Sequence, residues 1–286
     1  MLELVETQRY AVLSQRATRQ RWFGRSVALF TKTTRVDYGD PALRALMEPH
    51  LRKMRAARPT TDSSMTARIL RYDPRQYALG ASLREALGVA SLEACACADA
   101  HAKRALLAPL LDPATRRPFQ QAYDVWVRGV VLPALAGDAT RVRYQRFPCV
   151  RAQCPGDMTL GPHCDAAYGH APSAAIVSCL LTPAYGTNAL IYETNPGRED
   201  WTAFEGAEGE ALAFPGGLAA HFTSENTTGV TRWSIDARVV VADSSTSAYD
   251  AGSYFAVAER VGDAWRRVGD EIDAVDPRVG IPFDRK

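Results

Sequence analysis

Two histidines and one aspartate have the types and the spacing of a metal-binding group. His163 and Asp165 are separated by one residue, so on a β-strand both side chains would point to the same face, and a neighbouring strand could bring in His221 as a third ligand. Two imidazoles and one carboxylate leave coordination positions open and typically hold iron(II) for oxygen chemistry. A His-x-Asp pair alone is a weak signal, so its interpretation depends on the residues around it.

An arginine and a serine follow the second histidine at a spacing that suggests a receptor for a carboxylate. Ten residues separate His221 from Arg232, and Ser234 would share a strand face with that arginine. A guanidinium group can bind a carboxylate through two parallel hydrogen bonds, and a serine hydroxyl beside it can add another. This combination predicts a dicarboxylate co-substrate that chelates the metal at one end and is held by Arg232 at the other.

These residues resemble the iron(II)/2-oxoglutarate-dependent dioxygenases, and most of all the phytanoyl-CoA-hydroxylase-like oxygenases of streptomycin and other natural-product pathways. The resemblance extends from about Arg141 to Val241. The segments that carry it are Tyr144–Pro148, His163–His170, Tyr185–Asn188, Tyr192–Gly197 and Thr231–Ser234. Outside that span the sequence shows no pattern of the family.

The resemblance implies a set of ligands and a reaction. His163, Asp165 and His221 would hold iron(II), and 2-oxoglutarate would place its distal carboxylate on Arg232 and Ser234. With O2 as oxidant, the enzyme would oxidise an unactivated C–H bond of a small polar metabolite, such as an amino acid derivative or an aminocyclitol, and release succinate and CO2. Hydroxylation, desaturation and oxidative cyclisation all stay open. Related halogenases have a small residue in place of the carboxylate, so Asp165 argues against halogenation.

Three further residues are candidates for the site: Arg151 and Gln153, which precede His163 in the chain, and Arg238, which follows Ser234. Arg151 and Gln153 would share a strand face; Gln153 is assigned to 2-oxoglutarate and Arg151 to a substrate carboxylate, and surface positions are the alternative for both. Arg238 lies six residues beyond Arg232, about 20 Å along an extended strand. We therefore expect Arg238 at the substrate end of the site, paired with a nearby acid.

Two residues shortly after Asp165 complete the candidate set. Tyr168 and His170 are expected on a loop at the mouth of the cleft, where they would contact the substrate. His170 is also the main alternative to His221 as the third metal ligand, although its spacing from Asp165 is unusual for such a group.

Strand patterns dominate after residue 140. Short apolar or alternating runs are separated by turns rich in Gly, Pro and Asn, and they occupy residues 142–147, 175–181, 189–193, 210–214, 219–222 and 231–242. Such a series predicts a double-sheet jelly roll, that is, a cupin-like double-stranded β-helix. The resemblance implies the same fold.

Helical patterns dominate before residue 140. Residues 1–57 are predicted to be helix and connection, and residues 83–136 are predicted to form two or three helices, because prolines interrupt them, that pack on the outside of the sheet. We predict one domain over 1–286, with a helical scaffold at 1–140, a jelly-roll core at 141–242 and a C-terminal covering segment or lid at 243–286.

The segment that begins at Thr231 has one polar and one apolar face. Arg232, Ser234, Asp236 and Arg238 alternate with Trp233, Ile235, Ala237 and Val239. An outer strand with its charges in water is one interpretation. The other is that the polar face lines the cleft while the apolar face packs against the helices, as an active site requires.

Composition excludes several classes of function. The formal net charge of +2 over 286 residues gives no argument for nucleic-acid binding, and no apolar run is long enough to span a membrane. The first residues carry acids where a signal peptide would carry bases, so a cytoplasmic location is expected. In that compartment the six cysteines are expected to be small buried side chains rather than a disulfide framework. The expected partner is a small-molecule substrate, for a monomer or homodimer.

Two other classes of function remain open from the residues alone. A jelly-roll metalloenzyme without redox chemistry, such as a hydrolase or isomerase on zinc or manganese, would use the same metal ligands and would not need Arg232 and Ser234. A metabolite-binding cupin-like protein would keep the fold without turnover. Dependence on both iron(II) and 2-oxoglutarate distinguishes the oxygenase from both.

Overall fold

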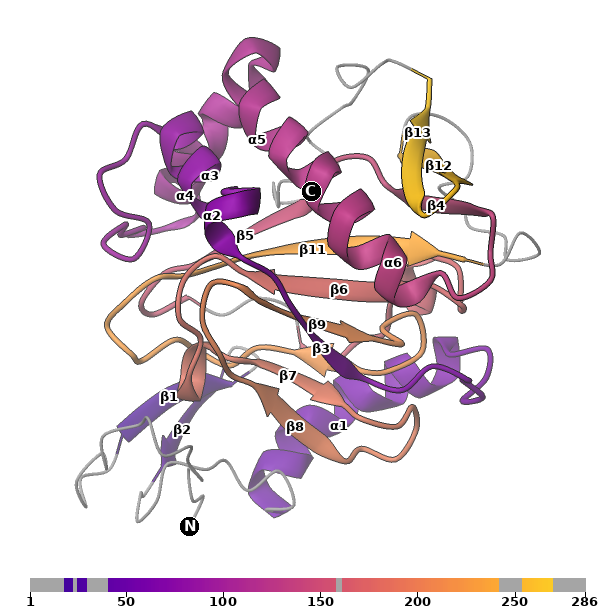
Figure 1. Cartoon of the computed structure of the whole chain (residues 1–286). Helices are drawn as coiled ribbons and strands as arrows, with labels where there is room; N and C mark the ends of the chain where they lie inside the picture. The colour runs from indigo at the N-terminus through magenta and orange to yellow at the C-terminus, as the bar shows by residue number, and fades with distance from the viewer. Residues whose placement is uncertain (1–17, 23–24, 30–40, 158–160, 242–253, 270–286) are drawn as a thin grey trace.

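The protein is mainly antiparallel β-sheet with a group of helices on one side (Figure 1). Its structure is a computed structural model that describes residues 18–22, 25–29, 41–157, 161–241 and 254–269. The helices of the described ranges are α1 (Pro41–Ala57), α2 (Pro74–Tyr77), α3 (Leu79–Leu87), α4 (Ala100–Leu107), α5 (Pro113–Trp126) and α6 (Leu132–Leu135). Short 3-10 turns occupy Ala108–Leu111, Asp165–Tyr168 and Gly186–Asn188, and a π-helical turn occupies Val127–Val131.

Helix starts follow local rules. Asp99 and Asp112 precede α4 and α5, and each carboxylate accepts a hydrogen bond from a backbone N–H of the first turn. Pro113 occupies the start of α5, where a missing N–H costs nothing. Two or three helices were predicted between residues 83 and 136; the structure has more than one helix there, as predicted, namely the end of α3, then α4, α5 and the short α6.

A large antiparallel sheet forms the centre of the molecule. Its strand order is β13-β12-β4-β11-β6-β9-β3, and β5 also pairs with β11. The strands are β3 (Arg68–Arg71), β4 (Arg141–Gln145), β5 (Cys149–Gln153), β6 (Ala175–Leu180), β9 (Glu210–Phe214), β11 (Arg232–Val240), β12 (Phe255–Val261) and β13 (Ala264–Val268).

A smaller antiparallel sheet covers one face of the large one. It has the order β10-β7-β8, with β7 at Leu190–Glu193, β8 at Trp201–Phe204 and β10 at His221–Phe222. Apolar side chains of both sheets form one cluster between them, in which the rings of Tyr192 and Phe214 lie 5.4 Å apart. Helix α1 packs on the outside of the small sheet through Met47, Leu51 and Met54.

The long strand β11 separates two environments. Trp233, Ile235, Ala237 and Val239 belong to the core formed with α3, α5 and α6. Of these helices, α5 and α6 pass in front of the large sheet in Figure 1. Arg232, Asp236 and Arg238 line a pocket on the opposite face. The interpretation with the polar face in the cleft is confirmed, and the outer strand with solvated charges is wrong.

Two packed antiparallel sheets with flanking helices agree with the predicted fold class at the level of a curled β-sandwich. The more specific assignment, a double-stranded β-helix, stays a prediction. Within the described ranges, no helix has both the length and the apolar character needed to cross a bilayer.

The N-terminal prediction is wrong in part. Where residues 1–57 were expected to be helix and connection, β1 (Thr18–Trp22) and β2 (Arg25–Leu29) pair as an antiparallel hairpin. Helix α1 confirms the helical part of that region. Residues 1–17 and 30–40 lie outside the described ranges.

The C-terminal segment is described only between residues 254 and 269. There, β12 pairs with β4 and β13 pairs with β12, so this part extends the large sheet as a hairpin. The rest of the predicted covering segment or lid, at 242–253 and 270–286, lies outside the described ranges. The expectation for the cysteines is also wrong at one pair, because Cys97 and Cys154 form a disulfide.

Candidate active site

The three predicted ligand residues meet at one point of the structure. His163 and His221 form an isolated antiparallel bridge, with their ring centroids 4.3 Å apart. One potential ligand atom from each of His163, Asp165 and His221 lies within 4.8 Å of the other two, and this is the group with metal-ligand spacing in the described part of the chain. Sequence spacing therefore predicted the correct set of neighbours.

The local structure that assembles this group differs from the prediction. His163 and Asp165 were expected on one strand, but Asp165 begins a 3-10 turn. Its N–H donates to the Gly216 carbonyl oxygen at 3.0 Å, and the next N–H donates to Gly217. A Cβ atom at Gly217 would collide with the Pro172 carbonyl oxygen. The 3-10 turn at Asp165 thus forms because the loop that contains Gly216 and Gly217 approaches it closely. The alternation of side chains along the sequence does not reveal this backbone contact.

Hydrogen bonds fix which nitrogen of each histidine faces the centre of the group. His163 Nδ1 lies 2.9 Å from the Gly161 carbonyl oxygen, and His221 Nδ1 lies 3.1 Å from the Ala219 carbonyl oxygen. A carbonyl oxygen only accepts hydrogen bonds, so each Nδ1 carries the proton and each Nε2 has a lone pair available for a metal. Backbone contacts of this kind are the usual outer support of metal-binding histidines.

A buried arginine holds the carboxylate of the group. Arg238 Nε donates to Asp165 Oδ2 at 2.5 Å, while Asp165 Oδ1 faces His221 Nε2 at 3.9 Å. The prediction that Arg238 pairs with a nearby acid is confirmed, and the acid is the candidate ligand itself. Arg238 NH1 also donates to Gln145 Oε1 and to the Tyr254 hydroxyl. One carboxylate oxygen is thereby left for a metal.

The protonation states suit a divalent cation. Burial lowers the pKa of His163 to about 3, with a further contribution from His221, and burial also lowers the pKa of His221. Burial alone would raise the pKa of Asp165, but the Arg238 guanidinium outweighs it and holds that pKa below its usual value. At neutral pH the site therefore offers two neutral imidazoles and one carboxylate, the donor set of an open iron(II) site.

A second buried arginine has only neutral partners. Arg232 is 3% exposed. Its Nε donates to the Asn188 carbonyl oxygen at 2.9 Å, NH1 to Ser234 Oγ at 2.5 Å, and NH2 to Gln153 Oε1 at 2.8 Å. Burial lowers its pKa to about 10, so it stays charged at neutral pH. Within the described ranges, no carboxylate lies within ion-pair distance of this cation.

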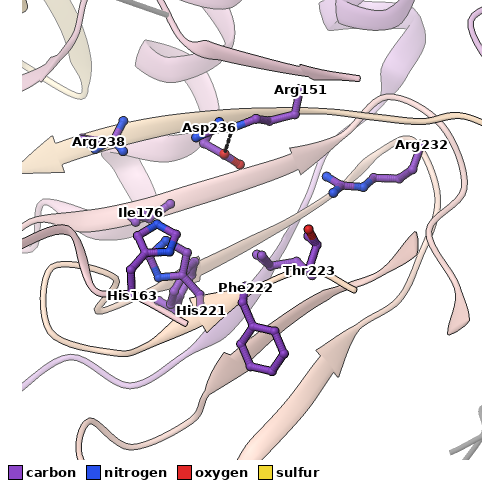
Figure 2. Close-up of a pocket in the computed structure, with 11 residues that line it drawn as sticks. Arg151, His163, Ile176, His221, Phe222, Thr223, Arg232, Asp236 and Arg238 are labelled. Atoms are coloured by element: carbon purple, nitrogen blue, oxygen red, sulfur yellow. Dashed lines mark hydrogen bonds and ion pairs between the residues drawn. The ribbon is translucent and has the colours of Figure 1, made fainter. Parts of the chain in front are cut away.

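A buried charge without a counterion is costly, so the environment of Arg232 points to an anionic ligand. Arg232 lines the same pocket as His163 and His221 (Figure 2). The side chains of Ser234 and Gln153 contact Arg232 and orient its guanidinium group. Their predicted contact with the co-substrate stays a prediction.

The remaining predicted substrate residues fall at different places. Arg151 lines the pocket, where its Nε donates to Asp236 Oδ2 at 2.9 Å. Tyr168 is 49% exposed and has its ring 5.4 Å from that of His163. His170 is buried beside Tyr254 and lies outside the group with metal-ligand spacing. Among the described residues the geometry thus favours His221 over His170 as the third ligand.

One buried acid was not identified from the sequence. Glu193 is fully buried, and its Oε2 accepts from the N–H of Ala220 at 2.8 Å and from Arg58 NH2 at 3.0 Å. Ala220 immediately precedes His221, so this acid fixes the backbone that carries the histidine. The only signal in the sequence was that Glu193 ends the apolar strand predicted at 189–193, and its partners come from distant segments.

Comparison with known proteins gives one relative of similar sequence. No family model matches the chain. The streptomycin biosynthesis protein StrG of Streptomyces griseus is 29% identical over 205 residues, which cover 70% of this chain and 97% of that protein.

Among the solved structures that are similar to part of the fold are two forms of one protein. The apo form of the non-heme monooxygenase ThoJ is 14% identical, with a TM-score of 0.41 over 61% of this chain and 79% of that chain. The ThoJ–Ni complex is 16% identical, with a TM-score of 0.37 over 62% of this chain and 78% of that chain. Overlap of this extent identifies neither a reaction nor a ligand, so the chemistry of the pocket is inferred from its own residues.

Proposed function

We propose that this protein is an iron(II)- and 2-oxoglutarate-dependent oxygenase of specialised biosynthesis. The observation that carries the proposal is one pocket lined both by the two histidines of the His/Asp/His group and by a buried arginine that has no ion-pair partner among the described residues. A metal site alone would serve a hydrolase or an isomerase equally well. The additional cationic receptor favours a ligand that chelates the metal and ends in a second carboxylate.

The hydrogen bonds of the two histidines and of Asp165 leave each of them with one donor atom free for iron(II). Both histidines present Nε2 to the centre because Nδ1 faces a carbonyl oxygen. Asp165 presents Oδ1 because Arg238 occupies Oδ2. Iron(II) bound with 2-oxoglutarate supplies the activation of O2 that C–H oxidation needs, with succinate and CO2 as co-products.

The chain's own residues have the tasks of binding, orienting and excluding water. Arg232, oriented by Gln153 and Ser234, would bind the distal carboxylate of 2-oxoglutarate. Ile176, Phe214 and Phe222 line the same pocket and provide apolar walls that limit the access of water. Arg151 and Tyr168 are the candidates for contacts with the substrate.

The substrate class is proposed from the similarity to StrG. A small polar metabolite of a biosynthetic pathway fits both that relative and the charged lining of the pocket. Hydroxylation, desaturation and oxidative cyclisation use the same oxidant, so the position of the substrate selects among them. Action as a monomer or homodimer on a soluble small molecule in the cytoplasm completes the proposal.

Anaerobic titration of the metal-free protein with iron(II) and then 2-oxoglutarate tests the proposal. We expect the weak visible charge-transfer band of an iron(II)–2-oxoglutarate chelate. The band should be absent in Asp165→Ala and in His221→Ala, and His170→Ala should retain it as the matched control. Iron binding without any band on addition of 2-oxoglutarate would instead favour the non-redox metalloenzyme.

A further inference from the structure

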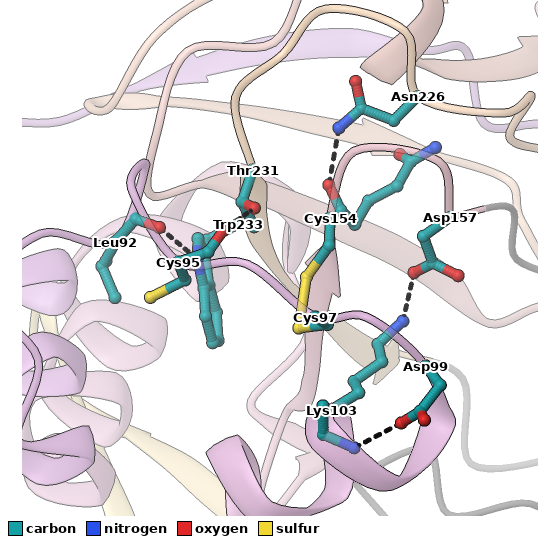
Figure 3. Close-up of a disulfide and its surroundings, with 12 residues drawn as sticks. Leu92, Cys95, Cys97, Asp99, Lys103, Cys154, Asp157, Asn226, Thr231 and Trp233 are labelled. Carbon is teal, nitrogen blue, oxygen red and sulfur yellow. Dashed lines mark hydrogen bonds and ion pairs between the residues drawn. A yellow bond between two sulfur atoms is a disulfide. The ribbon is translucent and has the colours of Figure 1, made fainter.

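The disulfide between Cys97 and Cys154 lies beside Thr231 and Trp233, the two residues that flank Arg232 in the chain (Figure 3). It joins Cys97, in the connection between α3 and α4, to Cys154, which directly follows β5. The two residues are 57 positions apart in the chain, and their Cα atoms lie 5.8 Å apart. The bridge therefore ties the helical region to the large sheet at the strand that carries Gln153.

The segment Leu92–Cys97, here called the clamp segment, holds the residues on both sides of Arg232. The Glu93 carbonyl oxygen accepts from the N–H of Thr231 at 3.0 Å. The Cys95 carbonyl oxygen accepts from Thr231 Oγ1 at 2.5 Å, and the Leu92 carbonyl oxygen accepts from Trp233 Nε1 at 2.8 Å. The start of β11 is thus fastened to the clamp segment immediately before and after the arginine.

The other half of the disulfide supports the arginine from the neighbouring strand. Gln153 precedes Cys154, is fully buried, and accepts from Arg232 NH2 through Oε1. Its carbonyl oxygen accepts from Asn226 Nδ2 at 2.7 Å, and its own Nε2 donates to the Ser224 carbonyl oxygen at 2.7 Å. Each cysteine is therefore close in the chain to groups that fix the guanidinium.

We propose that Cys97 and Cys154 form a thiol–disulfide site that sets the affinity of the protein for its dicarboxylate co-substrate, an inference that rests on the function proposed above. With the bridge closed, the clamp segment and β5 hold Arg232 in its binding position. With the bridge open, the support loosens and the co-substrate binds more weakly.

The redox step balances with a low-molecular-weight disulfide as oxidant. The two thiols of Cys97 and Cys154 lose two protons and two electrons and form one S–S bond. The oxidant accepts them and leaves as two thiols. Cys97 is partly exposed between exposed Ala96 and Ala98, whereas Cys154 is buried. Exchange therefore begins at the Cys97 sulfur, because attack requires access.

The metal end of the pocket has a different support. His163 and His221 are held by the Gly161 and Ala219 carbonyl oxygens, and Asp165 by Arg238 and Gly216. None of these contacts involves the clamp segment. Opening the bridge should therefore change the binding of 2-oxoglutarate and leave that of iron(II) unchanged.

The test compares two preparations of the full chain. One is oxidised with a low-molecular-weight disulfide and the other is reduced with a phosphine, and alkylation followed by mass spectrometry counts the thiols. The oxidised form should have four free thiols, at Cys95, Cys149, Cys164 and Cys179. Anaerobic titration then gives the dissociation constants of iron(II) and of 2-oxoglutarate for each form.

We expect 2-oxoglutarate to bind roughly tenfold more weakly to the reduced form, the scale of losing an outer support of a binding group, with the iron(II) dissociation constant unchanged. Cys97→Ser/Cys154→Ser should behave like the reduced form under both conditions. Cys95→Ser, which keeps the bridge, should retain the response. If the double variant does not fold, the two wild-type preparations still decide the question.

Three results would overturn the proposal. The first is six free thiols after oxidation, and the second is an equal 2-oxoglutarate affinity in both forms. The third is a parallel loss of iron(II) affinity, which would indicate general loosening of the fold. If neither form binds 2-oxoglutarate although iron(II) binds, the proposed oxygenase function fails and this inference fails with it. Equal binding to both forms leaves that function intact.

Discussion

Arg232 and Arg238 are the same residue type on the same face of β11, yet they have opposite surroundings. Arg238 is 7% exposed and pairs with Asp165. Arg232 is 3% exposed and contacts a serine, a glutamine side chain and a backbone carbonyl. Six residues of extended strand separate them, about 20 Å, so they occupy two ends of the site.

The difference indicates two different tasks for a buried guanidinium group. Arg238 already has its counterion, so it completes the fold and restrains a metal ligand. Arg232 is oriented by neutral groups and forms no ion pair with the described residues; Asp236 compensates its charge only from a longer distance, which is the arrangement of a receptor. A protein that used both arginines for stability alone would be expected to pair both of them, because an uncompensated buried charge is destabilising.

Removal of each arginine in turn is the strongest way to break this comparison. Arg238→Met leaves the Asp165 carboxylate buried without its partner and should lower the free energy of unfolding by about 3–5 kcal/mol. Arg232→Met leaves three neutral acceptors without their donor but also removes a buried charge that has no ion pair, so its cost should be smaller, about 1–3 kcal/mol. Denaturant unfolding of the metal-free proteins measures both. Equal losses would mean that the arginines do not differ in role.

Arg232→Met, which should have the smaller effect on stability, should have a large effect on binding of the co-substrate. This variant should weaken the binding of 2-oxoglutarate to the iron(II)-loaded protein by about 2–5 kcal/mol, the scale for losing one partner of a buried charge pair. Its iron(II) affinity should match that of the wild type, because Arg232 contacts none of the three metal-ligand candidates. Anaerobic titration checks both constants. Unchanged 2-oxoglutarate affinity would remove the basis for calling Arg232 the receptor.

A smaller effect should appear in the pH dependence of stability, which distinguishes the metal end from the arginine end. His163 has a pKa of about 3 in the folded protein, against an ordinary value of 6.5. Below pH 6.5 the unfolded chain therefore binds a proton that the folded chain does not, so stability is highest above that pH and falls as the pH decreases towards 3. Arg232, with a pKa of about 10, stays charged throughout this range.

The corresponding measurement is unfolding of metal-free protein between pH 4 and pH 7. His163→Gln should show a shallower decrease in stability than the wild type over this range. Ser234→Ala, at the arginine end, should keep the wild-type slope. A slope that His163→Gln leaves unchanged would assign the acid sensitivity to other groups.

Sequence patterns predicted the secondary structure best in strands whose side chains are set by the environments of the two strand faces. β9 has the predicted bounds of 210–214, and β11 has the predicted alternation of polar and apolar faces. Alternation failed where backbone contacts decide the conformation. The 3-10 turn at Asp165 depends on Gly216 and Gly217, which come from a loop some 50 residues away.

The sequence predicted which residues form the candidate site more completely than it predicted the role of each residue. The spacing of His163, Asp165 and His221 correctly predicted their assembly. Gln153 and Ser234 were assigned to the co-substrate, which stays a prediction, and the structure shows in addition that both contact Arg232. A polar residue that faces a pocket can bind a ligand or orient another side chain, and its position in the sequence does not distinguish these roles.

The sequence by itself determined the chemical types that could meet: two imidazoles, a carboxylate, and two arginines on one strand face. Only the tertiary structure decided which arginine has an acid, which nitrogen of each histidine faces inward, and that Cys97 reaches Cys154. The physical reason is that periodicity fixes the face on which a side chain lies. The partner on that face, and hence the charge balance, comes from segments far away in the chain.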